Sequence, residues 1–131
     1  MDWSYIAGFF DGEGSISVSK ISKKQGKIRA YQILVRFYNS DLDVLNKIKE
    51  FLGCGKIYQN NKKTDDRNIL YELTISSKSQ VQNILINLLK FSISKKEKIN
   101  YILKNFNFGY NNNLSFNLDK FHSLTLRKNV D

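Results

Sequence analysis

Histidine, cysteine and proline are almost missing from this chain. Of its 131 residues one is a cysteine (Cys54), one is a histidine (His122) and none is a proline. A single cysteine excludes an internal disulfide and a cysteine-rich zinc site. A single histidine argues against a histidine-based metal site, because histidine ligands come in sets, and against serine–histidine–acid catalysis. For both residues a packing or surface role is the simpler interpretation.

Long apolar runs are also lacking. No stretch reaches the roughly 18 residues that a membrane-spanning helix needs, and Met1-Asp2-Trp3 is not the basic, apolar start of a signal peptide. We therefore expect a soluble, intracellular protein with no membrane partner. The missing proline, together with abundant asparagine, lysine and isoleucine, indicates A+T-rich coding DNA. That composition is compatible with an organelle (mitochondrion or chloroplast) or with a prokaryotic cytoplasm.

Acidic residues are few relative to basic ones. The chain has 12 acidic and 21 basic residues, which give a net charge of +9 at pH 7. This charge predicts a polyanionic partner, and nucleic acid fits better than an anionic membrane, since no basic amphipathic helix with a clean apolar face is present. The length and the hydrophobic content of 41% predict one domain over residues 1–131. Its core should span about 2–106, followed by a C-terminal loop and short helix over 107–131.

Hydrophobic periodicity predicts an α+β fold. Apolar residues recur at helical spacing in four segments, at about 2–11, 42–52, 80–89 and 95–106. They alternate with polar residues in four others, at about 15–21, 31–38, 56–60 and 69–75. The order is helix, hairpin, helix, hairpin, helix, helix, so two hairpins should form one antiparallel sheet, a saddle with the helices on one face.

The outward face of the predicted sheet is polar and basic. Six basic residues and no acidic residue lie between Lys20 and Arg36. A solvated face is the plain alternative, but a concave sheet lined in this way fits the major groove of double-stranded DNA. The positions predicted to contact bases are Ser17, Ser19, Gln32, Arg36, Tyr38, Tyr58, Asn60 and Glu72. The turn lysines predicted to contact phosphates are Lys23, Lys24, Lys27, Lys62 and Lys63.

The segment YIAGFFDGEG, residues 5–14, combines two features. Ala7 and Gly8 are small enough to let backbones come close, and Asp11 and Glu13 alternate with glycines where the first helix is expected to end. The periodicity places Glu13 just past that end. Carboxylate and carbonyl oxygens are the ligands that Mg²⁺ prefers, so a metal site at a subunit boundary would need both features. For a short acidic motif alone, a solvated turn is the simpler interpretation.

With its flanking residues, IAGFFDGEG (6–14) resembles the signature of the LAGLIDADG homing endonucleases. The αββαββα order resembles that of the family over about 2–106. FYNSD (37–41) resembles the family's segment before the second helix, and KKEKINYIL (95–103) its basic helix start.

The resemblance implies a site-specific endonuclease. Such an enzyme makes a double-strand break in a long palindromic or pseudopalindromic DNA site by Mg²⁺-dependent phosphodiester hydrolysis, with Mn²⁺ or Ca²⁺ as substitutes for binding, and originates from an intron or intein. Because the chain holds one copy of the motif, it supplies half of an active site, and a two-fold homodimer is expected. The interface residues assigned in this way are Ile6, Ala7, Gly8 and Phe10.

The resemblance also assigns the metal ligands. Glu13 is the expected ligand, one from each half-site, and the carbonyl of Gly12 is an auxiliary ligand. Asp11 either contacts the metal or braces the turn between helix and strand.

Further catalytic roles follow from the same resemblance. Asn39 falls where the family places a polar side chain that orients water, although glutamine is common there. Lys95 is the best match to a lysine that stabilises charge, with Lys96 and Lys98 as rivals. The alternative for these lysines is that they only neutralise phosphates.

Two other functions remain open at this level. One is an intron maturase, a splicing cofactor that binds intron RNA on the same scaffold without cutting DNA. The other is a sequence-specific DNA-binding regulator that has lost catalysis, which would bind duplex DNA equally well with or without Mg²⁺.

Overall fold

The computed structural model describes residues 1–22, 26–60 and 69–124 of the chain. Its helices are α1 (Trp3–Glu13), α2 (Leu42–Leu52), α3 (Lys78–Leu89), α4 (Lys96–Asn105) and α5 (Leu118–Ser123). Its strands are β1 (Gly14–Ser22), β2 (Ile28–Asn39), β3 (Lys56–Asn60) and β4 (Leu70–Ile75). This succession follows the predicted αββαββα order. None of the described helices is long and apolar enough to cross a lipid bilayer.

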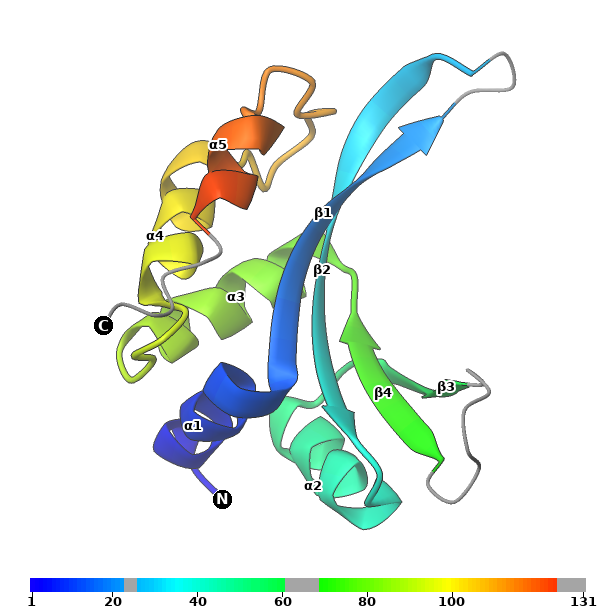
Figure 1. Cartoon of the computed structure of the whole chain (residues 1–131), viewed down its shortest axis with the longest axis vertical. Helices are drawn as coiled ribbons and strands as arrows, with labels where there is room; N and C mark the ends of the chain where they lie inside the picture. The colour runs from blue at the N-terminus through cyan, green and yellow to red at the C-terminus, as the bar shows by residue number, and fades with distance from the viewer. Residues whose placement is uncertain (23–25, 61–68, 125–131) are drawn as a thin grey trace.

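The described strands form one antiparallel sheet in the order β1-β2-β4-β3 (Figure 1). The two hairpins, β1–β2 and β3–β4, are joined through β2 and β4. The buried strand residues share one face of this sheet, since Ile16 lies opposite Val35 and Val35 lies opposite Ile75. Figure 1 shows α1, α3, α4 and α5 on one side of the sheet. The predicted α+β fold is thus confirmed.

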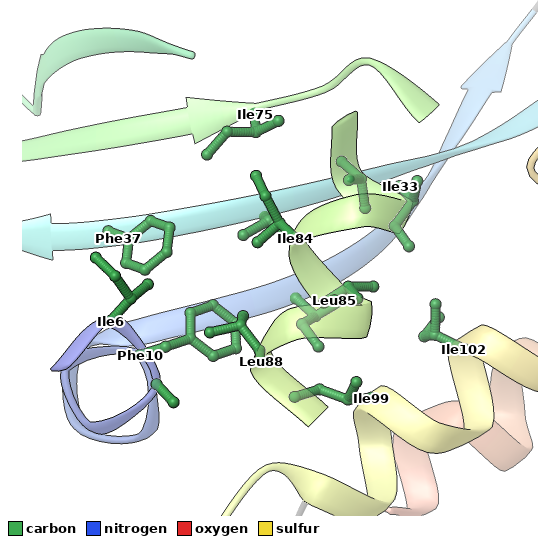
Figure 2. Close-up of a cluster of buried hydrophobic side chains, with 14 of the residues drawn as sticks. Ile6, Phe10, Ile33, Phe37, Ile75, Ile84, Leu85, Leu88, Ile99 and Ile102 are labelled. Carbon is green, nitrogen blue, oxygen red and sulfur yellow. The ribbon is translucent and has the colours of Figure 1, made fainter. Parts of the chain in front are cut away.

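Apolar side chains from the five described helices and the sheet meet in one core, and Figure 2 shows a part of it. The labelled members are Ile6 and Phe10 of α1, Ile33, Phe37 and Ile75 of the sheet, Ile84, Leu85 and Leu88 of α3, and Ile99 and Ile102 of α4. Each of these side chains is at most 2% exposed. Truncating such a residue typically costs about 2–5 kcal/mol, so the inner face of α1 is committed to the core of its own chain.

Helix α1 ends later than the sequence predicted. It begins with Asp2, whose carboxylate accepts a hydrogen bond from the Tyr5 N–H, and it continues through Gly12 to Glu13. The N–H of Gly14 donates to the Phe10 carbonyl and closes the last turn. Strand β1 starts at Gly14, where an added Cβ would overlap the Phe10 ring. Glu13 is therefore the last helical residue rather than a residue past the helix.

The other predicted boundaries agree with the structure within a few residues. Helix α2 covers the predicted range 42–52. Its N-cap, Asp41, accepts a hydrogen bond from the Asp43 N–H, and it ends at Gly53 in the left-handed conformation. The asparagine-rich segment after α4 is a loop held by Asn113, whose buried side chain hydrogen-bonds Asn107. The Asn112 carbonyl in this loop accepts the N–H of Tyr31 in β2, in the part of β2 that extends beyond its pairing with β4.

We expect the alanine variants of Gly53 and Gly55 to differ in stability. Both glycines have a positive φ, 74° and 105°, so alanine strains the backbone at either position, by about 1–2 kcal/mol. A methyl group at Gly53 meets open space, whereas at Gly55 it overlaps Leu73 of β4. Gly55→Ala should therefore lower the free energy of unfolding by roughly a further 1–3 kcal/mol in urea denaturation. Equal losses in the two variants would contradict the packing of this turn against β4.

Candidate functional site

The last turn of α1 is bound to the loop between α3 and α4 through Asp11. One carboxylate oxygen of Asp11 accepts a hydrogen bond from the Ser92 hydroxyl, and the other accepts the N–H groups of Ile93 (2.7 Å) and Ser94 (3.3 Å). Both oxygens thus hold this loop against the helix. These contacts agree with the bracing role predicted for Asp11, whereas its contact with a metal stays a prediction.

Lys95 reaches the same turn from the start of α4. Its Nζ donates to the Asp11 carbonyl at 2.7 Å and lies 5.6 Å from the centre of the Phe10 ring. Burial lowers the pKa of the Lys95 ammonium, and the Asp11 carboxylate partly offsets this effect. A half-buried cation is therefore placed at the C-terminal, electronegative end of α1, where a positive charge is favourable.

The two rival lysines lie elsewhere. The Nζ of Lys98 lies 4.6 Å from the centre of the Phe121 ring of α5. Burial lowers the pKa of Lys98, and the nearby charge of Lys95 lowers this pKa further. Lys96 is exposed. Of the three lysines, Lys95 is the one whose ammonium group hydrogen-bonds a residue of the motif, Asp11.

Glu13 and Gly12 are exposed at the end of α1. Within the described ranges no side chain hydrogen-bonds or ion-pairs with the Glu13 carboxylate, and no three Asp, Glu, His or Cys residues there could together hold a metal ion. Carboxylate and helix-terminal carbonyl oxygens suit a hard divalent cation in chemical type. One chain supplies too few of them, so further oxygen ligands would have to come from outside the chain.

Asn39 lies at the end of β2, where its side-chain oxygen accepts the Asp41 N–H at 2.7 Å. This bond forms the turn that leads into α2. The strand register sets Phe37 opposite Gly14, so Asn39 lies two residues beyond the paired part of β1. The water-orienting role of Asn39 stays a prediction.

The residues predicted to contact bases share the outer face of the sheet. Ser19 lies opposite Gln32, and Tyr38 lies opposite Glu72, which lies opposite Tyr58. Ser17, Arg36 and Asn60 belong to this face by alternation along their strands. The buried residues of β1, β2 and β4 point the other way. Their common placement is observed, whereas their contact with bases stays a prediction.

The turn lysines are only partly described. Lys27 is exposed, immediately before β2. The other four, Lys23, Lys24, Lys62 and Lys63, lie outside the described residues. Sequence reasoning missed Thr74, which belongs to the outer face and which the alternation of 69–75 could have identified. It also missed the loop 92–94, because no local signal links residues about 81 positions apart.

Burial within their own chain argues against an interface role for three of the four predicted interface residues. Ile6, Ala7 and Phe10 are each 0% exposed and belong to the core of their own chain. Figure 2 shows Ile6 and Phe10 facing the sheet and α3. Gly8 is exposed, as predicted for an interface residue, and so is Gly12 four residues later. A Cβ added at either glycine meets no atom within 4 Å. Together with the exposed Tyr5, these two glycines form the outer strip of α1.

We expect Asp11→Asn to lower the pKa of Lys95 further. The carboxylate stabilises the ammonium, so its replacement by a neutral amide favours the uncharged amine and moves the titration to lower pH. NMR titration of the lysine side-chain ¹³Cε signals in both proteins measures this shift. Glu50→Gln, which removes an exposed carboxylate on α2, is the matched control and should leave Lys95 unchanged. A rise in the pKa of Lys95 in Asp11→Asn would contradict the geometry.

Solved structures similar to this chain include homing endonucleases. The archaeal intron-encoded homing endonuclease I-Vdi141I, solved in complex with DNA, is 26% identical with a TM-score of 0.70, over 94% of this chain and 81% of I-Vdi141I. The LAGLIDADG meganuclease I-AabMI, solved bound to uncleaved DNA, is 28% identical with a TM-score of 0.57, over 79% of this chain and 36% of I-AabMI.

A third structure shares the fold. The homing endonuclease I-CvuI, solved with its target in the presence of calcium, is 23% identical with a TM-score of 0.62, over 78% of this chain. This chain spans 63% of the length of I-CvuI. A family model described as LAGLIDADG endonuclease matches residues 6–104. Because this match covers most of the chain, the chain belongs to the LAGLIDADG endonuclease family.

Proposed function

We propose that this chain is a homing endonuclease that acts as a homodimer. It cuts both strands of a long palindromic or pseudopalindromic DNA site by metal-dependent hydrolysis of phosphodiester bonds. The observation that carries the proposal is the exposed carboxylate of Glu13, next in sequence to the start of the polar sheet and two residues from the carbonyl that Lys95 contacts. Membership of the family and the DNA complexes of I-Vdi141I and I-AabMI support it.

The homodimer follows from the incompleteness of the site. One chain offers Glu13 and the Gly12 carbonyl, whereas a divalent cation needs about six oxygen ligands. The outer strip of α1, with Gly8 and Gly12 on one face, lets a second α1 approach closely, because neither glycine has a side chain to separate the backbones. Two-fold pairing along this strip brings both Glu13 carboxylates together and makes a palindromic target the natural partner.

Each residue at the end of α1 then has a distinct role. Glu13 and the Gly12 carbonyl would hold Mg²⁺, or Mn²⁺ or Ca²⁺ in its place. The bound cation would supply Lewis-acid chemistry at the phosphodiester. The Lys95 ammonium, held by the Asp11 carbonyl, stabilises negative charge that develops on the phosphate. Asn39 orients water through the amide nitrogen that its turn does not use.

The outer face of the sheet is the DNA-binding surface. Its serines, glutamine and tyrosines present hydrogen-bonding groups to base edges in the major groove. The net charge of +9 favours association with any duplex, and Lys27 with the turn lysines adds phosphate contacts. Phosphate contacts position the protein, while the sheet supplies the selectivity.

Cleavage of a randomised duplex library in Mg²⁺, followed by sequencing of the cut ends, tests the activity. We expect cuts in a palindromic consensus by the wild-type protein and a loss of at least roughly 100-fold with Glu13→Gln, since that variant keeps the shape of the side chain but lacks the charge. Glu50→Gln, an exposed position on α2, should cut like wild type. Undiminished cleavage by Glu13→Gln would remove Glu13 from its role. Duplex binding without nicks would indicate a regulator, and binding only to intron RNA a maturase.

Gly8→Leu tests the dimer. Leucine is a good helix former, and the position is open within the chain, so the variant should fold. Its side chain would hold two α1 helices apart, and we expect monomers in sedimentation-velocity experiments at concentrations where the wild type is dimeric, together with lost double-strand cleavage. Ile86→Ala, at an exposed apolar position on α3, is the control and should remain dimeric. A monomeric wild type that cuts both strands would contradict the dimer.

A further inference from the structure

Four polar side chains meet on the outer face of the sheet, and we call them the Arg36 cluster: Ser17, Arg36, Glu72 and Thr74. The Nη1 of Arg36 donates to the Ser17 hydroxyl at 3.1 Å. The Nε of Arg36 lies 3.3 Å from Oε2 of Glu72. The Thr74 hydroxyl donates to the same Oε2 at 3.1 Å. The chain of contacts therefore runs across β1, β2 and β4.

These contacts fix the direction of the guanidinium. Arginine has five N–H groups, and in the described part of the chain Arg36 donates a hydrogen bond from Nη1 to Ser17, while its Nε ion-pairs with Glu72. The other N–H groups include those of Nη2, and neighbouring N–H groups of a guanidinium form a fork that matches the O6 and N7 atoms of guanine. The side chains of Arg36 and Glu72 are only 27% and 20% exposed, so their neighbours also restrict their motion.

By itself, Glu72 favours neither the stability of the fold nor DNA binding on this surface, so its role depends on Arg36. A partly exposed ion pair contributes little to stability, and a carboxylate on a face that meets DNA repels phosphates. Its contacts with Arg36 and Thr74 both use the one oxygen, Oε2. The carboxylate thus acts as a support that orients the guanidinium, and Thr74 in turn holds the carboxylate.

The cluster also lies close to the proposed cutting site. Arg36 is opposite Ser15, which follows Glu13 by two residues. A base read by Arg36 therefore lies in the inner part of each half-site, near the scissile phosphate, and two-fold symmetry places it once in each half.

We propose that Glu72 is a positioning residue for base selectivity. Supported by Thr74, it presents the Arg36 guanidinium to a guanine at one symmetric inner position of the DNA site. Glu72 does not itself read a base in this arrangement, in contrast to the role predicted for it from the sequence. The inference rests on the proposed DNA-binding function of the outer face.

Selection of bound duplexes from a randomised library in Mg²⁺-free buffer tests this role without cleavage. In Glu72→Gln we expect the preference for guanine at one inner position to fall by about tenfold, the scale of one bidentate contact. The affinity for non-selected duplex should stay equal or rise, because a negative charge is removed. Thr74→Val, which keeps the shape but lacks the hydroxyl, should weaken the same preference by a smaller factor. A side chain with only a structural role would not change one base position selectively.

The double variant separates the support role from direct reading. Arg36→Ala should abolish the guanine preference, and adding Glu72→Gln to it should change the selected sequence no further. Circular dichroism checks that each variant is folded. If Glu72→Gln is unfolded, the preference of Thr74→Val is used as the test instead. Three results would overturn the inference: an unchanged preference in Glu72→Gln, a change at another base position, or a further change in the double variant. A wild type that selects no duplex would overturn the nuclease proposal instead.

Discussion

The carboxylate of Asp11 fixes the position of the helix end on which the proposed chemistry depends. It accepts two N–H groups and one hydroxyl from the loop between α3 and α4, and hydrogen bonds to a charged acceptor contribute roughly 1.5–3 kcal/mol each. Its backbone carbonyl receives Lys95. One residue therefore sets the spacing between the exposed carboxylate of Glu13 and the half-buried ammonium. The core below α1 prevents this end from moving away from the sheet.

Helix α1 serves two surfaces at once. Ile6, Ala7 and Phe10 pack against the sheet and α3, so the opposite side, with Gly8 and Gly12, has to face outward at the 3.6-residue period of the helix. A larger residue on the inner side would disturb a fully buried core, whereas a larger residue on the outer side meets nothing within the chain. The motif thus has a buried side and an exposed side, and for this reason Ala7 is buried whereas Gly8 and Gly12 are exposed.

The polar sheet and the helix end form one continuous piece of backbone. Strand β1 begins at Gly14, directly after Glu13, and the Phe10 ring occupies the space that a side chain at Gly14 would need. The outer face of the sheet is thereby held at a fixed distance from the exposed carboxylate of Glu13. In the proposed enzyme this distance would determine where the cut phosphodiester bond lies relative to the bases that the sheet contacts.

Much of the fold follows from local patterns, because caps, turns and alternation depend on neighbours a few residues away. The range predicted for α2 is the one observed between Asp41 and Gly53, and alternation assigned the predicted base-contact residues to one face of the sheet. The resemblance to the family also singled out Glu13 and Lys95, whose roles stay predictions. The sequence did not determine which side of α1 is buried or where that helix ends, nor that Arg36 would meet Glu72. Those outcomes were decided by tertiary packing, since each depends on contacts between segments that only the folded core brings together.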